Sequence, residues 1–237
     1  MRPLHCFLVL AAALSLGPAL ARADDESLPP PRASRVRIMA EMGHRWHLDT
    51  AHRAFDNDAG GFTPGVLTWI DLNNPDGRFV LAAELSFNAT GAQGDLRGSY
   101  DTRFSTLAGQ AGLIARWQPR EWIAPYLRVA GGLGYHTWRL EPQSTGQSLG
   151  NEAWSPVGTA GLGVLFQTPR IFRRAGWRGG RLLLGVEGGM FFASPVDVTV
   201  GPPPGDADPE LLTVQSNSLG PVNASAPYFR VTFGLAL

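Results

Sequence analysis

The sequence predicts an all-β protein, an eight-stranded antiparallel up-and-down transmembrane β-barrel. Three observations lead to this prediction. Large apolar and small residues alternate with a period of two along eight segments, the connections between segments alternate between short and long, and helical periodicity is almost absent. Beyond the N-terminal region, no stretch reaches the roughly 18 consecutive apolar residues of a transmembrane helix.

The N-terminal 23 residues have the features of a secretory signal peptide. An apolar run covers residues 7–20, and Ala21-Arg22-Ala23 forms an A-x-A cleavage site. Residues 24–34 contain three consecutive prolines and are expected to form a periplasmic tether. Residues 35–237 are then expected to form the barrel as one domain.

Charge and cysteine content exclude several classes of protein. The chain has 20 basic and 20 acidic residues, and removing Arg2 and Arg22 with the signal leaves a net charge of −2. A nucleic-acid binder would show a basic excess, so none is expected as a partner. The only cysteine, Cys6, leaves with the signal, which excludes a disulfide framework and a thiol active site in the mature chain.

Eight segments carry the period-two alternation, and each is expected to form one strand: 35–48, 62–72, 79–87, 103–117, 125–139, 154–166, 181–192 and 228–237. The second alternates less clearly and has Pro64 near its start, where a strand tolerates proline best. In the other seven, in order, the apolar face is marked by Ile38, Leu81, Leu113, Leu127, Leu162, Leu184 and Phe233. We expect the last segment to pair with the first and to close the barrel.

The second face of the segments is rich in Gly and Ala and carries charges near mid-segment. A solvated face would carry scattered charges of both signs, whereas a membrane barrel turns its apolar face outward and its small or polar face inward. Eight residues are therefore predicted to form a lumenal network: Arg37, Glu41, Arg45, Glu84, Arg116, Arg128, Glu187 and Arg230. Five arginines against three acids leave two positive charges, which water or anions could balance.

The connections predict the orientation of the barrel. Residues 73–77 and 118–124 are short turns and 168–180 is a moderate one, whereas 49–61, 88–102, 141–153 and 194–225 are mostly longer and more polar. Short periplasmic turns and long external loops are typical of outer-membrane barrels. Loop 194–225 includes the acidic, proline-rich stretch 200–210 and is a possible contact for an extracellular partner.

Tryptophan placement predicts aromatic girdles at the two membrane interfaces, where an amphipathic indole ring is favoured. Four tryptophans are expected at the periplasmic rim and three at the outer rim: Trp69, Trp117, Trp122 and Trp177, then Trp46, Trp138 and Trp154.

The sequence resembles the small eight-stranded outer-membrane barrels of Gram-negative bacteria, the group that contains the OmpA transmembrane domain and OmpX. The likeness lies in APYLRVAGGLGY (124–135), in the Gly-rich strands 158–166 and 185–192, and in the terminal YFRVTFGLAL. It implies location in the outer membrane, contact with its lipids and insertion by the barrel-assembly machinery. That machinery reads a C-terminal signal, here Phe229, Phe233 and Leu237, although family members usually end in an aromatic residue.

Neither a metal site nor an enzyme is expected. His44 and His47 have opposite parity on a strand, and His52 lies in a loop, so the three cannot share an ion. His136 is predicted to face the lumen, away from lipid substrates, and no Gly-x-Ser-x-Gly elbow is present. No cofactor is expected.

The sequence therefore predicts a non-enzymatic outer-membrane barrel with a structural or surface-interaction role. Its lumen is expected to be filled by Arg–carboxylate pairs, because eight strands leave little free bore. The alternatives are a small channel, a bilayer-facing lipid-modifying enzyme and a soluble secreted β-barrel binder.

Overall fold

The computed structural model describes residues 35–47, 60–96, 100–142, 149–169, 173–174, 177–178, 180–200 and 217–237. The predicted signal peptide, the tether, His52 and the stretch 201–210 lie outside these residues. Within them all regular structure is β, and no helix has the length and hydropathy needed to cross a bilayer.

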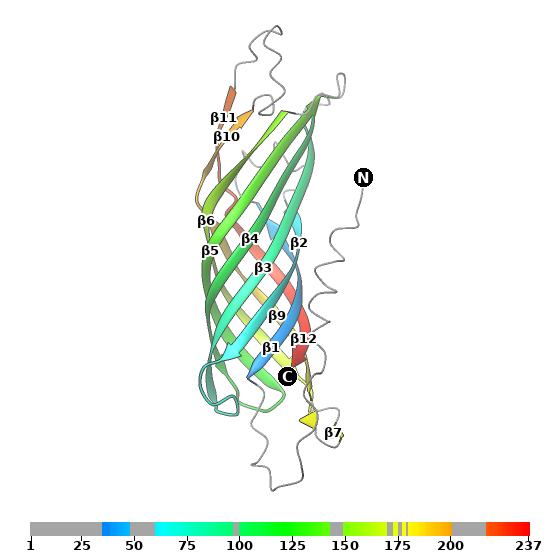
Figure 1. Ribbon diagram of the computed structural model, residues 1–237, viewed down its shortest axis with the longest axis vertical. Coiled ribbons are helices and arrows are strands. Elements are labelled where there is room, and N and C mark those ends of the chain that lie inside the picture. Colours follow the sequence, from blue (N-terminus) through cyan, green and yellow to red (C-terminus); the bar gives the residue numbers. More distant parts are fainter. Residues whose placement is uncertain are drawn as a thin grey trace.

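Eight strands form one closed barrel (Figure 1): β1 (Val36–Trp46), β2 (Gly60–Asp71), β3 (Phe79–Leu96), β4 (Tyr100–Trp117), β5 (Ile123–Pro142), β6 (Leu149–Gln167), β9 (Arg181–Ala193) and β12 (Ala226–Ala236). Each pairs antiparallel with the next barrel strand along the chain. The last strand pairs with the first, with Ala40 opposite Phe233, so the barrel has no open edge along this seam. The predicted eight-stranded antiparallel barrel is confirmed.

In the orientation of Figure 1, the lower end of the barrel contains the start of β1 and the C-terminus, and the upper end contains the far ends of β3 to β6. Strands β3 to β6 have 18 to 20 residues, whereas β1, β2, β9 and β12 have 11 to 13. The four long strands project past the others at the upper end, and we call this part the extension, residues 92–106 and 136–156 where described.

Two segments that were predicted to be loops lie mostly in strands of the extension. Most of the stretches 88–102 and 141–153 belongs to strands, because β3 and β4 pair up to Leu96 and Tyr100, and β5 and β6 up to Leu140 and Leu149. The alternation is hidden there because both faces carry polar residues, such as Gln93 outside and Thr102 inside.

Two hairpins lie outside the barrel sheet. The first joins β7 (Arg173–Arg174) and β8 (Trp177–Arg178) at the lower end. The second joins β10 (Val196–Val200) and β11 (Asn217–Val222) at the upper end, so two parts of the predicted long connection 194–225 form strands of their own. Its pairing shifts register between Val198 and Thr199, opposite Gly220, whose φ of 90° suits glycine and accommodates the bulge.

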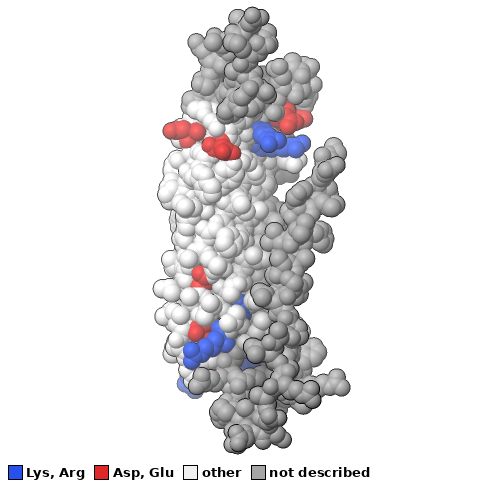
Figure 2. Space-filling view, in the orientation of Figure 1, with Lys and Arg blue, Asp and Glu red and all other residues white. Residues whose placement is uncertain are grey.

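The molecule is apolar on the outside of its barrel wall. Most large side chains on the predicted apolar face are exposed, among them Leu162 at 67%. Exposed charged side chains of the described strands and turns lie near the two ends, including Arg78 and Glu121 below and Arg103 and Arg139 above. Figure 2 shows charges gathered at both ends of the visible face and a broad, almost uncharged band between them. We call this band the belt.

The inside of the barrel, the lumen, is filled by side chains in layers. A lower apolar cluster contains Met39, Leu67, Trp69, Ala82, Ile114, Ala124, Tyr126, Leu165, Leu183 and Ala236. An upper apolar cluster contains Ala92, Phe104, Ala108, Trp138, Leu140, Val157, Phe191, Ala193, Val196, Val198, Val222, Ala224 and Tyr228. Small residues make room for large ones. A Cβ on Gly163 would lie 2.8 Å from Cε1 of Tyr126, and one on Gly161 would lie 2.8 Å from Oε1 of Glu187.

Candidate functional site

The predicted lumenal charges all lie inside the barrel. Each of the eight residues is at most 5% exposed: Arg37, Glu41, Arg45, Glu84, Arg116, Arg128, Glu187 and Arg230. Each stands on the inward parity of its strand, so the period-two pattern positions all of them. Burial of this many charges is costly unless they are paired, and the contacts between them form the candidate site.

The central part of the network is a continuous ionic chain across five strands. Nε of Arg128 on β5 donates to both oxygens of Glu84 on β3, at 2.8 and 2.7 Å. Nη1 of Arg128 also lies 3.7 Å from Oε1 of Glu187 on β9. Arg230 on β12 reaches Glu187 Oε2 at 2.7 Å and also pairs with Glu41 on β1.

Hydroxyl and amide groups complete the chain. The Tyr228 hydroxyl donates to Oε1 of Glu187, and Nη2 of Arg128 lies 3.2 Å from Oγ of Ser86. Oε1 of Gln110 accepts from Thr159 at 2.9 Å and lies 3.5 Å from Arg128 Nη2. Side chains from strands far apart in sequence therefore meet across the middle of the lumen.

A second ionic group lies at the lower end and includes a residue that the sequence analysis missed. Oδ2 of Asp71 accepts from Nη1 of Arg37 at 2.5 Å and from Nη2 of Arg116 at 3.2 Å. Asp71 is the last residue of β2, the strand with the weakest alternation, and its inward parity was therefore not recognised. It reduces the predicted excess of two positive charges to one.

Arg45 lies apart from these two groups. Its Nη2 donates to Oδ1 of Asn88 at 2.6 Å, and its guanidinium carbon lies 3.7 Å from the ring centroid of Phe191. Among the described residues, no carboxylate lies within 4 Å of its nitrogens. A neutral acceptor and an aromatic face therefore hold a buried cation at this point.

His136 is fully buried and belongs to a local hydrogen-bonded group of the lumen. Its Nδ1 lies 2.9 Å from Oγ1 of Thr106 and its Nε2 lies 2.8 Å from Oγ of Ser155. In a Ser–His–acid catalytic triad a carboxylate would contact the second ring nitrogen of the histidine. Here the Thr106 hydroxyl takes that place, and Ser155 itself is buried. The group cross-links β4, β5 and β6, and the predicted lumenal position of His136 is confirmed.

The other two described histidines, His44 and His47, lie in different environments. His44 is half-buried and contacts Trp46, with 4.9 Å between ring centroids, whereas His47 is buried. In the part of the chain that the structure describes, no three His, Cys, Asp or Glu residues are placed to hold an ion.

Two of the seven predicted girdle tryptophans point into the lumen. Trp69 is 0% exposed and packs edge-to-face on Tyr126, with 5.1 Å between ring centroids. Trp138 is 1% exposed, and its Nε1 donates to the carbonyl oxygen of Thr199 at 3.0 Å. The prediction is wrong for both. Trp138 shares its parity with the lumenal His136, and the parity of Trp69 was obscured by the weak pattern of β2.

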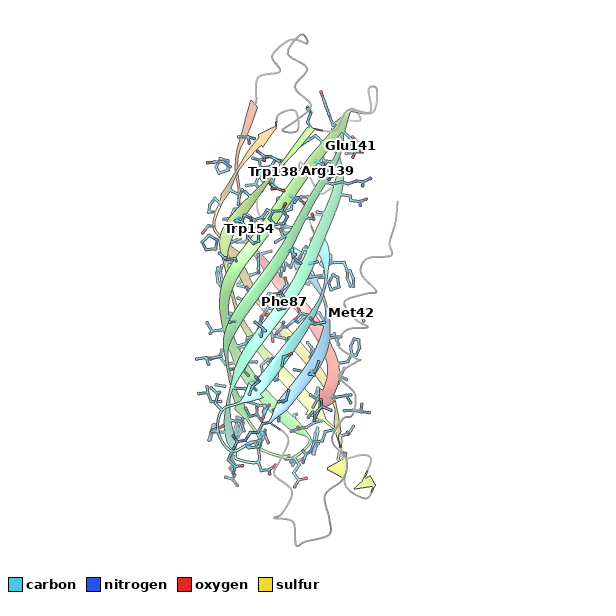
Figure 3. All side chains as sticks on the ribbon, viewed as in Figure 1. Met42, Phe87, Trp138, Arg139, Glu141 and Trp154 are labelled. Atoms are coloured by element: carbon cyan, nitrogen blue, oxygen red, sulfur yellow. The ribbon has the colours of Figure 1, made fainter. Side chains whose placement is uncertain are left out.

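The remaining described tryptophan side chains point outward. Trp46 and Trp154 lie toward the upper end, Trp117 and Trp122 at the lower end, and all four are exposed. Figure 3 contrasts Trp154, on the outside of the barrel, with Met42 and Phe87 in the belt and with Arg139 and Glu141 in the extension. The side chain of Trp177 lies outside the described set.

Phe229 and Phe233 of the predicted C-terminal signal lie on the outward face of β12, and Leu237 directly follows the strand. Phe229, Phe233 and Leu237 are all exposed, and β12 is paired on both sides, with β1 and with β9.

Comparisons with known proteins find similar solved structures, but only at low sequence identity. No protein-family model matches the chain, and no curated protein matches it. The chain is similar to the crystal structure of Ail, the attachment invasion locus protein of Yersinia pestis, at 13% identity and a TM-score of 0.46, over 86% of this chain and 98% of that one. It is also similar to Ail in complex with the heparin analogue sucrose octasulfate, at 12% identity and a TM-score of 0.42, over 85% and 96% of the two chains. At these values the likeness assigns neither a family nor an activity to this chain.

Proposed function

We propose that the chain is an integral protein of the bacterial outer membrane, with a non-conducting lumen and a non-catalytic, surface-interaction role. The single observation that carries the membrane location is the inverted distribution of polarity. The wall is apolar outside, and the eight lumenal charges are buried inside. A soluble barrel would bury its large apolar side chains and expose the charged ones.

The dimensions of the barrel support this location. A transmembrane strand needs about 9–11 residues to cross a bilayer, and β1, β2, β9 and β12 have 11 to 13. The exposed Trp117 and Trp122 below the belt and Trp46 and Trp154 above it would then lie in the two interfaces. Phe229, Phe233 and Leu237 would face lipid and would serve as the C-terminal signal for the barrel-assembly machinery.

The lumenal network supports a closed barrel over a channel. The ionic chain from Glu84 to Glu41 spans the lumen between the two apolar clusters. The second ionic group, around Asp71, lies near the lower opening of the barrel. Conduction would require an ion to separate these pairs at a cost of several kcal/mol each.

The extension supports a role in contacts outside the cell. It carries strands past the belt and presents a polar outer surface that includes Gln93, Arg103, Arg139 and Asn151. Hairpin β10–β11 packs beside it through Trp138, and Nδ2 of Asn151 donates to Oγ1 of Thr199 at 2.8 Å. An ordered sheet of this kind offers a preformed surface to an extracellular partner.

Location and orientation are tested together with single cysteines, because the predicted mature chain has none. Asp197→Cys on β10 and Asp76→Cys in the lower turn are expressed in whole cells and treated with a maleimide that does not cross membranes. We expect label on Asp197→Cys alone until the envelope is permeabilised. Label on both in intact cells, or recovery of the protein in the soluble periplasm, would contradict the proposal.

The closed lumen is tested by conductance in planar bilayers. The wild-type barrel is expected to give no steady current, and a Glu84→Ala, Glu187→Ala double variant is expected to leak. A steady wild-type current that changes its ion preference in Arg116→Gln and Arg128→Gln would favour the channel instead.

A further inference from the structure

The buried charges of the lumen do not balance. The described strands bury five arginines and four acids, namely Arg37, Arg45, Arg116, Arg128 and Arg230 against Glu41, Asp71, Glu84 and Glu187. Every one of the four acids is paired with an arginine, and Arg45 is the arginine with no carboxylate within 4 Å among the described residues. A buried excess of one positive charge is unfavourable without a negative counterpart.

Hydrogen bonding in the lumen has the same imbalance. Among the described residues, seven buried side-chain groups have no hydrogen-bond partner: Arg37 Nε, Trp69 Nε1, Gln110 Nε2, Arg116 Nη1, Arg230 Nε and the hydroxyls of Tyr126 and Thr232. All seven can donate, and none is a side-chain carbonyl or carboxylate oxygen. Among the described residues, the lumen is therefore short of acceptors as well as of negative charge.

A small cavity lies beside Arg45, and Arg230, whose Nε is one of the seven unpaired donors, also lines it. Its lining includes Arg45, Asn88, Phe191, Arg128 and Arg230, together with one acidic residue, Glu41. Glu41 is paired with Arg230, so its charge is already compensated. The centre of a water molecule can occupy about 20 Å³ of this cavity, which is enough for a single water or a monoatomic ion.

We propose that this cavity is a binding site for one small monovalent anion of the size of chloride. Arg45 and Arg230, which both line the cavity, would hold the anion. The anion supplies the negative charge that Arg45 lacks and accepts hydrogen bonds from the donors around it. The narrow volume excludes sugars, nucleotides and phosphate esters. The site is independent of the membrane location and of any external partner.

The first test measures how anions stabilise the folded full-length mature barrel in detergent micelles. Thermal unfolding is followed by gel mobility in sodium chloride, sodium bromide and sodium gluconate at equal ionic strength. A ligand that binds only the folded state raises the midpoint with its concentration. We expect a saturable rise of a few degrees in chloride and bromide relative to gluconate. Equal midpoints in all three salts would overturn the proposal in favour of bound water.

Variants then locate the effect. Asn88→Asp gives Arg45 a carboxylate in place of the amide oxygen that it contacts at 2.6 Å, so the variant should be stable in gluconate and lose its response to chloride. Arg45→Gln should also lose the response, whereas Arg103→Gln, on the exposed outer face of β4, should keep it. If Arg45→Gln does not fold, Asn88→Asp still decides, because a chloride response that persists in Asn88→Asp places the anion elsewhere and overturns the site.

A direct measurement completes the test. Crystals soaked in bromide should show an anomalous peak between Arg45 and Arg230 in the wild type and none there in Asn88→Asp. A peak found only on the outer surface would overturn the assignment.

Discussion

The middle of the lumen and the upper end of the barrel are filled in opposite ways. In the middle, Glu187 is shared by Arg128 and Arg230, and charged groups from five strands meet. At the upper end, Trp138 and Val198 belong to an apolar cluster that joins hairpin β10–β11 to the extension. One region is held by a few strong and mutually dependent contacts, and the other by many weak ones.

This difference indicates what each region controls. Removing one partner from a buried ionic chain leaves another charge unpaired, so damage spreads through the barrel. Removing one contact from the upper cluster loses packing locally, next to a hairpin outside the barrel sheet. We expect the middle to set global stability and the upper end to set the order of the surface that faces outward.

The largest effect is expected from Glu187→Ala. The substitution leaves Arg128 and Arg230 without a shared carboxylate and should lower the free energy of unfolding by about 3–5 kcal/mol. Urea unfolding in lipid vesicles, followed by tryptophan fluorescence, measures the change. Glu121→Ala, in an exposed lower turn, should shift it by less than about 0.5 kcal/mol. Equal effects of the two variants would show that the ionic chain does not stabilise the barrel.

The belt and the extension are compared by placing an arginine on the outer face of each. Leu162→Arg should cost about 2–4 kcal/mol if that position faces the bilayer midplane. Gln93→Arg, on the exposed face of the extension, should cost close to nothing. The same unfolding assay gives both values. Similar small costs would mean that water reaches the belt.

Lumenal packing is tested with a matched pair of glycines on β6. A Cβ on Gly163 would press on the Tyr126 ring, so Gly163→Ala should cost about 1–3 kcal/mol through overpacking. A Cβ on Gly158 would meet the Ala130 carbonyl oxygen at an ordinary 3.5 Å, so Gly158→Ala should be neutral or slightly stabilising. The reverse order would mean that Gly163 does not face a filled lumen.

The smallest effect is expected from Trp138→Phe. Loss of the hydrogen bond to the Thr199 carbonyl should cost about 0.5–1.5 kcal/mol. Hydrogen exchange followed by mass spectrometry should show faster exchange in 196–200 and unchanged exchange in β12. Faster exchange throughout the barrel would remove the distinction between the two regions.

Parity explains how much of the candidate site could be predicted. The eight lumenal charges were found because each stands in a strand whose neighbours alternate clearly, as around Glu84 and Arg128. Asp71 and Trp69 were misplaced or missed because β2 contains Gly, Thr and Pro residues that blur the alternation. The period-two alternation predicts which face of a strand a residue occupies. It gives no information where the two faces of the strand carry similar residues.

Hairpin β10–β11 and the extension show a second limit. Val196, Val198 and Val222 are buried against the upper cluster, yet the period-two alternation of β10 covers only the five residues 196–200, and β11 shows no such alternation. Their strands exist because of partners that lie far away along the chain, such as Trp138. Local pattern carries little information about such pairing.

The sequence by itself determined the number of barrel strands, their antiparallel order and the inward set of charges, because the alternating segments can be counted and a period of two assigns each residue to one face of its strand. The tertiary structure decided which charges pair, that Asp71 joins them and that Arg45 is left beside a small cavity. These outcomes depend on distances of a few ångströms across the lumen between residues up to 189 positions apart, as in the pair of Arg230 with Glu41. Spacing along the chain does not contain them.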